Sequence, residues 1–152
     1  MAPADYDGDG KTDIAVVRGT SGSKVWYILQ STSSILRVVQ FGINNDKTLV
    51  ADFDGDQITD FAVFRPSANS WYILKSRDNS FTGVQFGLGS DVHIPADFDG
   101  DSKADIAVYR PSTGAWYSLN SSNGAFVARQ FGAGNDLPAP CAAQPQLYTG
   151  CQ

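Results

Sequence analysis

A nine-residue segment rich in aspartate occurs three times and is the part of the sequence best suited to chemistry. The copies span residues 5–13, 52–60 and 97–105, and each has aspartate at positions 1, 3, 5 and 9, an aromatic residue at position 2 and glycine at position 4. Four carboxylates this close repel one another unless a cation lies among them. Hard oxygen ligands on a short, tightly turned loop suit Ca²⁺, which takes about 6–8 oxygens. The pattern therefore predicts a calcium loop in three copies.

The charge of the chain is concentrated in these segments. All 16 acidic residues are aspartates, twelve of them lie in the three segments, and the formal net charge is −5. An acidic chain without a cluster of Lys and Arg is a poor candidate for binding nucleic acid. No apolar run approaches the roughly 18 residues of a membrane span. We interpret the acidity as a demand for metal ions.

The elements that position the loops follow from the spacing. The segments begin at Asp5, Asp52 and Asp97, which gives repeats of 47 and 45 residues. Periods of about 40–50 residues with strand-like content are typical of propeller blades. After the third loop, residues 106–110, 115–119 and 125–131 are rich in β-formers and are separated by turn residues. Together with a short extended piece at 92–96, they predict four antiparallel strands per repeat and no helix.

Some of these strands are apolar at consecutive positions, which bears on the architecture. Residues 71–74 read Trp-Tyr-Ile-Leu, and such a run indicates burial on both faces of a sheet. Sheets stacked face to face around an axis can provide this, so we expect an all-β fold made of β-propeller blades. The expected domain is a three-blade segment at residues 1–140, with blades at about 3–47, 48–92 and 93–137. Residues 141–152 would form a C-terminal tail.

The repeat resembles a known family. Asp-Phe-Asp-Gly-Asp, followed by Asp-Ile-Ala-Val-Tyr-Arg-Pro and closed by Gln-Phe-Gly, is similar to FG-GAP/VCBS repeats, the blade repeats of integrin alpha-like β-propellers. The resemblance covers roughly residues 3–140. It implies that each loop joins the first two strands of a blade and binds one Ca²⁺, three per chain. The side-chain ligands it implies are those at positions 1, 3, 5 and 9: Asp5, Asp7, Asp9, Asp13, Asp52, Asp54, Asp56, Asp60, Asp97, Asp99, Asp101 and Asp105. It also implies backbone carbonyl ligands from position 7: Lys11, Ile58 and Lys103.

An EF-hand is the competing interpretation of an aspartate-rich loop. That motif needs a glutamate at position 12 and flanking helices. Position 12 is valine in every copy: Val16, Val63 and Val108. The flanking segments are strand-like, so an EF-hand is excluded. Within the propeller interpretation, position 6 varies: Gly10, Gln57 and Ser102. The two non-glycine copies are expected to have tighter backbones or weaker sites.

Three further sets of residues could serve a ligand. The Trp-Tyr pairs at 26–27, 71–72 and 116–117 could stack sugars, but the doubly buried strand pattern favours packing between blades. An arginine ends the second strand of each repeat, and its repetition favours structural pairing with backbone or loop carboxylates: Arg18, Arg65 and Arg110. His93 is the only histidine and has no histidine counterpart in the other repeats. We find no catalytic set and expect a protein that is not an enzyme.

Function and compartment are expected from the same features. Aspartate loops without glutamate favour an extracellular setting, and Cys141 and Cys151 could form a disulfide there. Residues 1–4 run straight into the first loop without a leader, which leaves open a removed signal, a fragment or an engineered array. The expected function is a calcium-stabilised binding or scaffold module that recognises a glycan or a protein. The alternatives are a non-catalytic propeller fragment of a larger secreted enzyme and an engineered or truncated repeat array that self-assembles.

Three blades leave two apolar blade faces without a neighbour. Typical propellers have about 4–8 blades. Two chains of three blades make six and use both faces, whereas three chains would exceed the usual range. We therefore expect a homodimer in which two chains close a six-blade ring.

Overall fold

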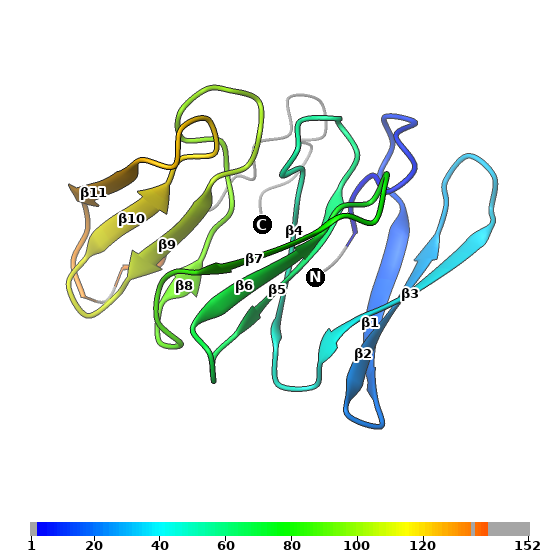
Figure 1. The fold of residues 1–152 in the computed structure, drawn as a ribbon, viewed down its shortest axis with the longest axis horizontal. Helices are drawn as coiled ribbons and strands as arrows, with labels where there is room; N and C mark the ends of the chain where they lie inside the picture. The colour runs from blue at the N-terminus through cyan, green and yellow to red at the C-terminus, as the bar shows by residue number, and fades with distance from the viewer. Residues whose placement is uncertain (1–2, 135, 140–152) are drawn as a thin grey trace.

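The structure, a computed structural model, describes residues 3–134 and 136–139, which form three antiparallel sheets side by side (Figure 1). The sheets follow the sequence repeats, with strand orders β1-β2-β3, β4-β5-β6-β7 and β8-β9-β10-β11. The strands are β1 Ile14–Thr20, β2 Ser23–Leu29, β3 Leu36–Ile43, β4 Lys47–Ala51, β5 Asp60–Arg65, β6 Ser70–Leu74, β7 Phe81–Gln85, β8 Val92–His93, β9 Ile106–Arg110, β10 Ala115–Leu119 and β11 Phe126–Gln130.

The described part of the chain contains no helix, so the all-β prediction is confirmed for these residues. None of the described segments is a helix long and apolar enough to cross a membrane. The side-by-side arrangement of sheets resembles propeller blades. The predicted tail and the proposed disulfide between Cys141 and Cys151 lie outside the described residues.

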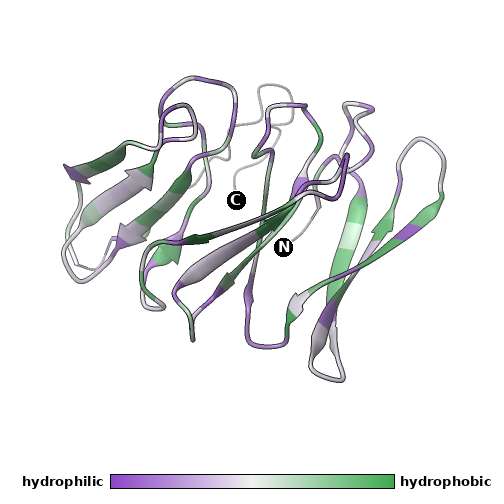
Figure 2. Ribbon diagram, in the orientation of Figure 1, coloured by the Kyte–Doolittle hydropathy of each residue, from purple (hydrophilic) through white to green (hydrophobic). Residues whose placement is uncertain are grey.

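The middle sheet is buried on both faces, as its apolar runs predict. Along β5, Phe61 and Val63 pack against the first sheet, whereas Ala62 and Phe64 pack against the third sheet. This alternation follows from the two-residue period of a strand. All four side chains are fully buried. The hydrophobic residues of β5 accordingly lie at the centre of the molecule (Figure 2).

A tryptophan anchors the central strand of each sheet. The indole N–H groups of Trp26, Trp71 and Trp116 donate to the carbonyls of the phenylalanines that close their repeats, at 2.9, 3.1 and 2.9 Å. Trp26 and Trp71 are fully buried between sheets, which confirms the core prediction for these two residues. Trp116 is partly exposed because no further sheet lies against it in the described part of the chain.

The prediction of four strands per repeat is wrong for the first repeat. Its sheet has three strands, and β1 forms one edge. The residues that align with Val50 and Ala51 at the end of β4 are Pro3 and Ala4, and of these only Ala4 forms an isolated bridge, with Asp13. The third sheet has all four strands, although β8 is only two residues long.

Candidate metal centre

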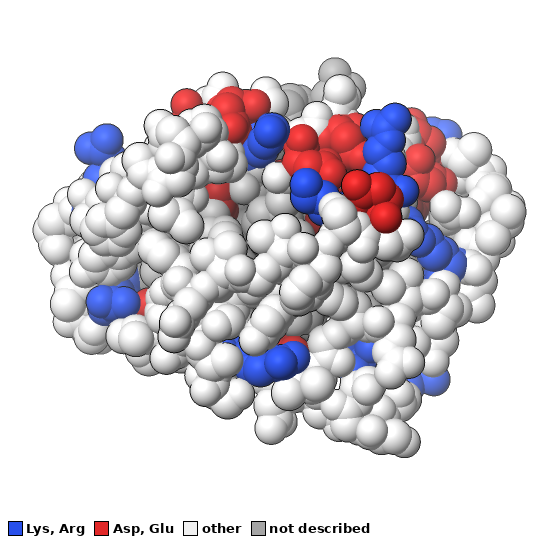
Figure 3. All heavy atoms as spheres, in the orientation of Figure 1, with Lys and Arg blue, Asp and Glu red and all other residues white. Residues whose placement is uncertain are grey.

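The three aspartate loops gather at one edge of the sheets. In the second and third repeats they connect the first strand to the second, which matches the predicted position, and in the first repeat the loop leads into β1. Acidic side chains cluster along the upper edge of the molecule in Figure 3, with several Lys and Arg side chains among them. The loops are therefore neighbours as well as repeats.

The first aspartate of each loop folds the backbone around its own carboxylate. Asp5 accepts a hydrogen bond from the Gly8 N–H at 2.7 Å through one oxygen and from the Gly10 N–H at 2.8 Å through the other. The second loop repeats this pair at 2.6 and 2.7 Å, and the third at 2.6 and 2.9 Å. The carboxylate at position 1 therefore fixes the turn before any ion binds.

The turn requires left-handed backbone at two positions. Position 4 is glycine in all copies, with φ of 80–83° in Gly8, Gly55 and Gly100. At position 6, Gln57 and Ser102 have φ of 69° and 70°, close to the 81° of glycine in the first copy. The backbone at Gln57 and Ser102 is therefore not tighter than at Gly10, contrary to that part of the expectation. The non-glycine residues adopt the same conformation at a local cost of about 1 kcal/mol.

The aspartate at position 9 connects each loop to the turn that follows β2, β6 or β10. One oxygen of Asp60 accepts from the Phe53 N–H at 2.9 Å, and the other accepts from the Ser76 N–H at 2.8 Å. Asp13 and Asp105 make the same two bonds in their repeats, and all three side chains are fully buried. These residues therefore hold the fold together as well as contributing charge, a role that the sequence pattern did not reveal.

The structure brings carboxylates together in every loop, but in different combinations. Three carboxylates lie with oxygens within 4.8 Å of one another in each loop: Asp5, Asp7 and Asp13; Asp52, Asp54 and Asp60; Asp97, Asp99 and Asp101. Position 5 is missing from the first two groups (Asp9 and Asp56), and position 9 from the third (Asp105). The full set of four is thus not assembled around one point, although each loop has enough carboxylate oxygens to hold a cation.

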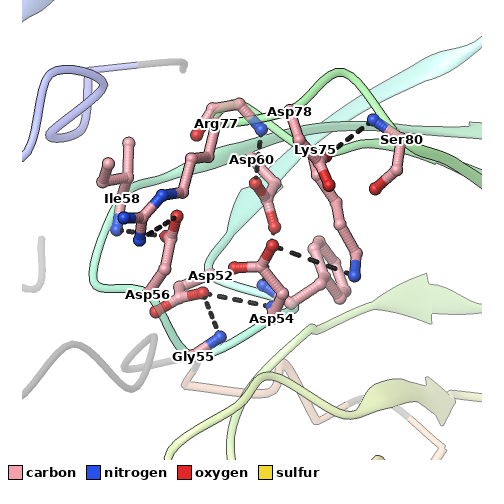
Figure 4. Close-up of polar contacts among 12 residues, drawn as sticks. Asp52, Asp54, Gly55, Asp56, Ile58, Asp60, Lys75, Arg77, Asp78 and Ser80 are labelled. Atoms are coloured by element: carbon pink, nitrogen blue, oxygen red, sulfur yellow. Dashed lines mark hydrogen bonds and ion pairs between the residues drawn. The ribbon is translucent and has the colours of Figure 1, made fainter.

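In the second loop, two carboxylate oxygens are buried without a hydrogen-bond donor. They are Oδ1 of Asp54 and Oδ2 of Asp56. The nearest cations are Lys75, 3.8 Å from Asp54, and Arg77, 3.9 Å from Asp56 (Figure 4). Buried carboxylate oxygens are normally satisfied. A cation held by Asp52, Asp54 and Asp60, whose oxygens converge, would satisfy the Asp54 oxygen, so this donor set fits Ca²⁺.

The electrostatics of the second loop point the same way. Burial raises the pKa of Asp60 to about 6, and the charges of Asp54 and Asp52 add to the effect against the two backbone N–H groups that lower it. Burial also raises the pKa of Asp56, again helped by Asp54 and Asp52. The ionised loop is therefore unfavourable by itself. A divalent cation reverses this balance because it favours the charged form of each carboxylate.

Beside the other two loops, hydroxyl groups contact the loop carboxylates, and Thr32 and Ser122 stand where the second repeat has Arg77. In the third loop, the Ser122 hydroxyl donates to Asp99 at 2.6 Å and the Ser121 hydroxyl donates to Asp101 at 2.8 Å. In the first loop, the hydroxyls of Ser31 and Thr32 donate to Asp9. The bond from Ser31 lowers the pKa of Asp9, and that from Ser121 lowers the pKa of Asp101. In these two loops, hydroxyl donors together with the charges of Lys11 and Lys103 favour the ionised form of the position-5 carboxylates.

The expected carbonyl ligands lie at position 7. The N–H groups of Lys11, Ile58 and Lys103 donate to the position-5 aspartates at 2.7, 2.9 and 2.9 Å. Coordination by the carbonyls of these residues stays a prediction.

A second repeated carboxylate was missed by the sequence reasoning. Arg65 makes a double hydrogen bond with Asp46, at 2.9 and 3.0 Å, and Arg110 makes one with Asp91, at 2.9 Å for both contacts. The structural role predicted for these two arginines is confirmed, but their partners are not loop carboxylates. The signal was present in the sequence, since an aspartate follows each Phe-Gly by four residues.

The comparison with protein families agrees with the repeat. Residues 52–108 match the family described as FG-GAP-like repeat. The matched region begins at the first aspartate of the second loop and includes the whole third loop. The chain therefore contains an FG-GAP-like repeat, which is typical of propeller-type binding or scaffold modules. Searches among curated proteins and among solved structures gave no match.

Proposed function

We propose that this chain is a calcium-stabilised β-propeller module that works outside the cell as a binding or scaffold unit. The observation that carries the proposal is the second loop, where three carboxylates converge and one of them, Asp54, has a buried oxygen without a hydrogen-bond donor. The first and third loops have the same aspartate spacing as the second. Three Ca²⁺ ions, one per loop, neutralise this edge and hold each loop against its strands.

The role of the metal is structural in this proposal. The second and third loops join strands of one sheet, the first leads into β1, and the position-9 aspartates are buried beneath them. Asp52, Asp54 and Asp60 would hold the ion in the second loop, and the converging carboxylates of the other two loops would do so there. The chain then binds a glycan or a protein through its loop surfaces or the grooves between sheets, and catalyses no reaction.

Thermal unfolding in Ca²⁺ and in excess chelator tests the metal. Ca²⁺ binds the folded chain and not the unfolded one, so it raises the melting temperature by mass action. At a Ca²⁺ concentration of about 100 times Kd, the expected gain in stability is about 2.7 kcal/mol per site. Mg²⁺ at the same concentration should give a smaller shift, since it dehydrates reluctantly and prefers octahedral sites.

A matched pair of variants separates specific binding from general charge effects. Asp54→Asn removes a carboxylate from the second loop, so the Ca²⁺-induced shift should shrink. Asp78→Asn removes the same charge from an exposed turn outside the loop, where Asp78 accepts a hydrogen bond from the Ser80 N–H. It should leave the shift unchanged. Identical melting curves in Ca²⁺ and in chelator would overturn the proposal.

A further inference from the structure

We propose that the outer face of the first sheet docks onto the outer face of the third sheet of a second copy of this chain, with Arg18 of one copy paired to Asp136 of the other. The inference does not rest on metal binding. It rests on an interface that the chain already contains twice, between the first and second sheets and between the second and third.

Each internal interface is formed by an apolar pair of side chains from one sheet that packs into the preceding sheet, and the equivalent pair on β1 is exposed. In the two internal interfaces, pairs of side chains enter the preceding sheet: Phe61 and Val63, then Ile106 and Val108, which are at most 8% exposed. The equivalent pair on β1 is Ile14 and Val16, and these are 69% and 56% exposed. Two large apolar side chains side by side on an edge strand, with the repeat's own packing pattern, indicate a partner surface.

The receiving half is open on the third sheet. In the first sheet, Tyr6 is buried and stacks on Phe61, at 5.2 Å between ring centroids. Its counterpart in the third repeat, Phe98, is 50% exposed. Phe98, Trp116 and Phe131 line a cavity of about 430 Å³. This cavity lies where the preceding two sheets receive the apolar pair of the next sheet.

The ion pair of the repeat is divided between the two ends. Arg65 and Arg110 each pair with the aspartate 19 residues earlier, Asp46 and Asp91. Asp136 is the third such aspartate, and its carboxylate accepts from the Ala133 N–H at 2.8 Å as the other two accept from theirs. Within the described residues, Asp136 meets no arginine and Arg18 meets no carboxylate. Each end therefore presents half of a pair that the fold makes elsewhere.

Arg18 is already oriented for this pairing. Its guanidinium lies over the Tyr27 ring at 5.1 Å, as Arg65 lies over Tyr72 at 4.5 Å. Residues 137–139 follow Asp136 in the way that β4 follows Asp46, and Leu137 is 89% exposed. In the docked pair they add to the free edge of β1, where the first sheet lacks its fourth strand.

A backbone hydrogen bond between neighbouring loops completes the match. The Thr59 N–H donates to the Asp5 carbonyl, and the Ala104 N–H donates to the Asp52 carbonyl, both at 2.7 Å. The next donor and acceptor in this series are the Thr12 N–H and the Asp97 carbonyl, at opposite ends of the described chain. Docking of a second copy brings them together. Because each copy has one of each face, two copies close a ring of six sheets.

Two residues make the receiving face more polar than its internal counterparts. Ser118 occupies the place of Ile28 and Ile73, and Arg129 that of Val39 and Val84. Less apolar area is therefore buried when the copies dock, so the association is reversible and depends on concentration. Arg129→Val, which restores the residue of the other repeats, should lower the dissociation constant by about tenfold or more.

Light scattering after gel filtration in Ca²⁺, over a range of concentrations, gives the decisive mass. The expected value at high concentration is twice 16.3 kDa. Val16→Asp and Phe131→Asp alter side chains that are 56% and 80% exposed, so each variant folds but stays a monomer alone. An equimolar mixture of the two should form a heterodimer, because each chain keeps the face that the other lacks. A wild-type monomer at all concentrations, or a mixture that does not associate, would overturn the proposal.

A charge exchange tests the ion pair. Arg18→Asp and Asp136→Arg should each weaken association by at least about tenfold, and the chain with both changes should recover it. Failure of the double variant to recover association would contradict the pairing.

Two other outcomes would contradict the closed pair. A monomer whose Trp116 fluorescence changes with added sugars would assign the cavity to a glycan instead. Larger open oligomers would show that two copies do not close a ring. These masses are independent of the Ca²⁺ melting shift, so failure of one proposal is distinguishable from failure of the other.

Discussion

At the scale of single residues, the position-9 aspartates show how one carboxylate serves two purposes. Asp60 accepts two backbone N–H groups, which favour its ionised form, yet its pKa is raised to about 6. Burial and the neighbouring carboxylates outweigh the two hydrogen bonds. Such a residue holds the fold through its hydrogen bonds, and a bound cation would stabilise its ionised form.

His93 is a second residue whose charge is linked to the fold. Its ring lies 3.7 Å from the Phe64 ring, centroid to centroid, and its Nε2 is buried without a hydrogen-bond partner. Burial, helped by Lys47 and opposed by Asp91, lowers its pKa to about 4. The unfolded chain, with a histidine pKa of about 6.5, therefore binds more protons between about pH 4 and 6.5.

We accordingly predict that His93 makes the free energy of unfolding rise with pH across this window. The contribution is lost as the pH falls through 6.5 toward 4, and it is on the order of 1 kcal/mol because the ring is only partly buried. His93→Thr introduces the residue found at the equivalent Thr48. Urea unfolding at several pH values should show a flatter profile for this variant between pH 4 and 6.5. An unchanged slope would contradict the assigned pKa.

At the scale of elements, we predict that replacing the tryptophan of a sheet lowers the stability of the fold by an amount that differs between sheets. Trp71 is fully buried between two sheets, so Trp71→Ala should destabilise the fold by about 3–5 kcal/mol. Trp116 makes the same indole hydrogen bond but is partly exposed, so Trp116→Ala should cost roughly half as much in the monomer. Chemical denaturation of both variants below the concentration of association measures the difference. Equal losses would contradict the idea that packing between sheets dominates.

The strands and loops could largely be predicted from the sequence because they repeat. The aspartate spacing placed the loops, and the runs of β-formers placed β5, β6, β9 and β10. The first repeat departs from the pattern because only Ala4, of the residues aligned with β4, bridges to its neighbour. The partners of Arg65 and Arg110 were missed because the pairing joins a turn to the end of a strand 19 residues later. The repeated aspartate after each Phe-Gly marks the partner in the sequence, but the pairing itself follows from the register of the strands.

The composition of each loop site could be predicted less well than its existence. The only difference between the sites that the sequence predicted was at position 6, whereas the folded loops group different carboxylates and have different neighbours. The difference arises from the turn after β2, β6 or β10, which supplies hydroxyls in two repeats and Lys75 with Arg77 in the other. Residues from a separate turn cannot be assigned to a loop by spacing within the loop.

At the scale of the whole molecule, the described chain is a row of three sheets with two unlike open faces and one acidic edge (Figure 1, Figure 3). The apolar faces lie on opposite sides of the row, as expected when every sheet inserts one pair of side chains into its predecessor. The acidic edge runs across all three sheets. The proposed ion sites therefore lie along the acidic edge, whereas the proposed docking surfaces are the two end faces of the row.

The number of Ca²⁺ ions bound per chain tests the central claim most directly. Isothermal titration calorimetry of metal-free protein with Ca²⁺ at neutral pH should count three ions per chain, and Asp54→Asn should reduce the count to two or weaken one site selectively. The same titration of Asp78→Asn should match the wild type. The account predicts one ion for each aspartate loop; a titration without heat of binding, or a count that the loop substitution leaves unchanged, would contradict it.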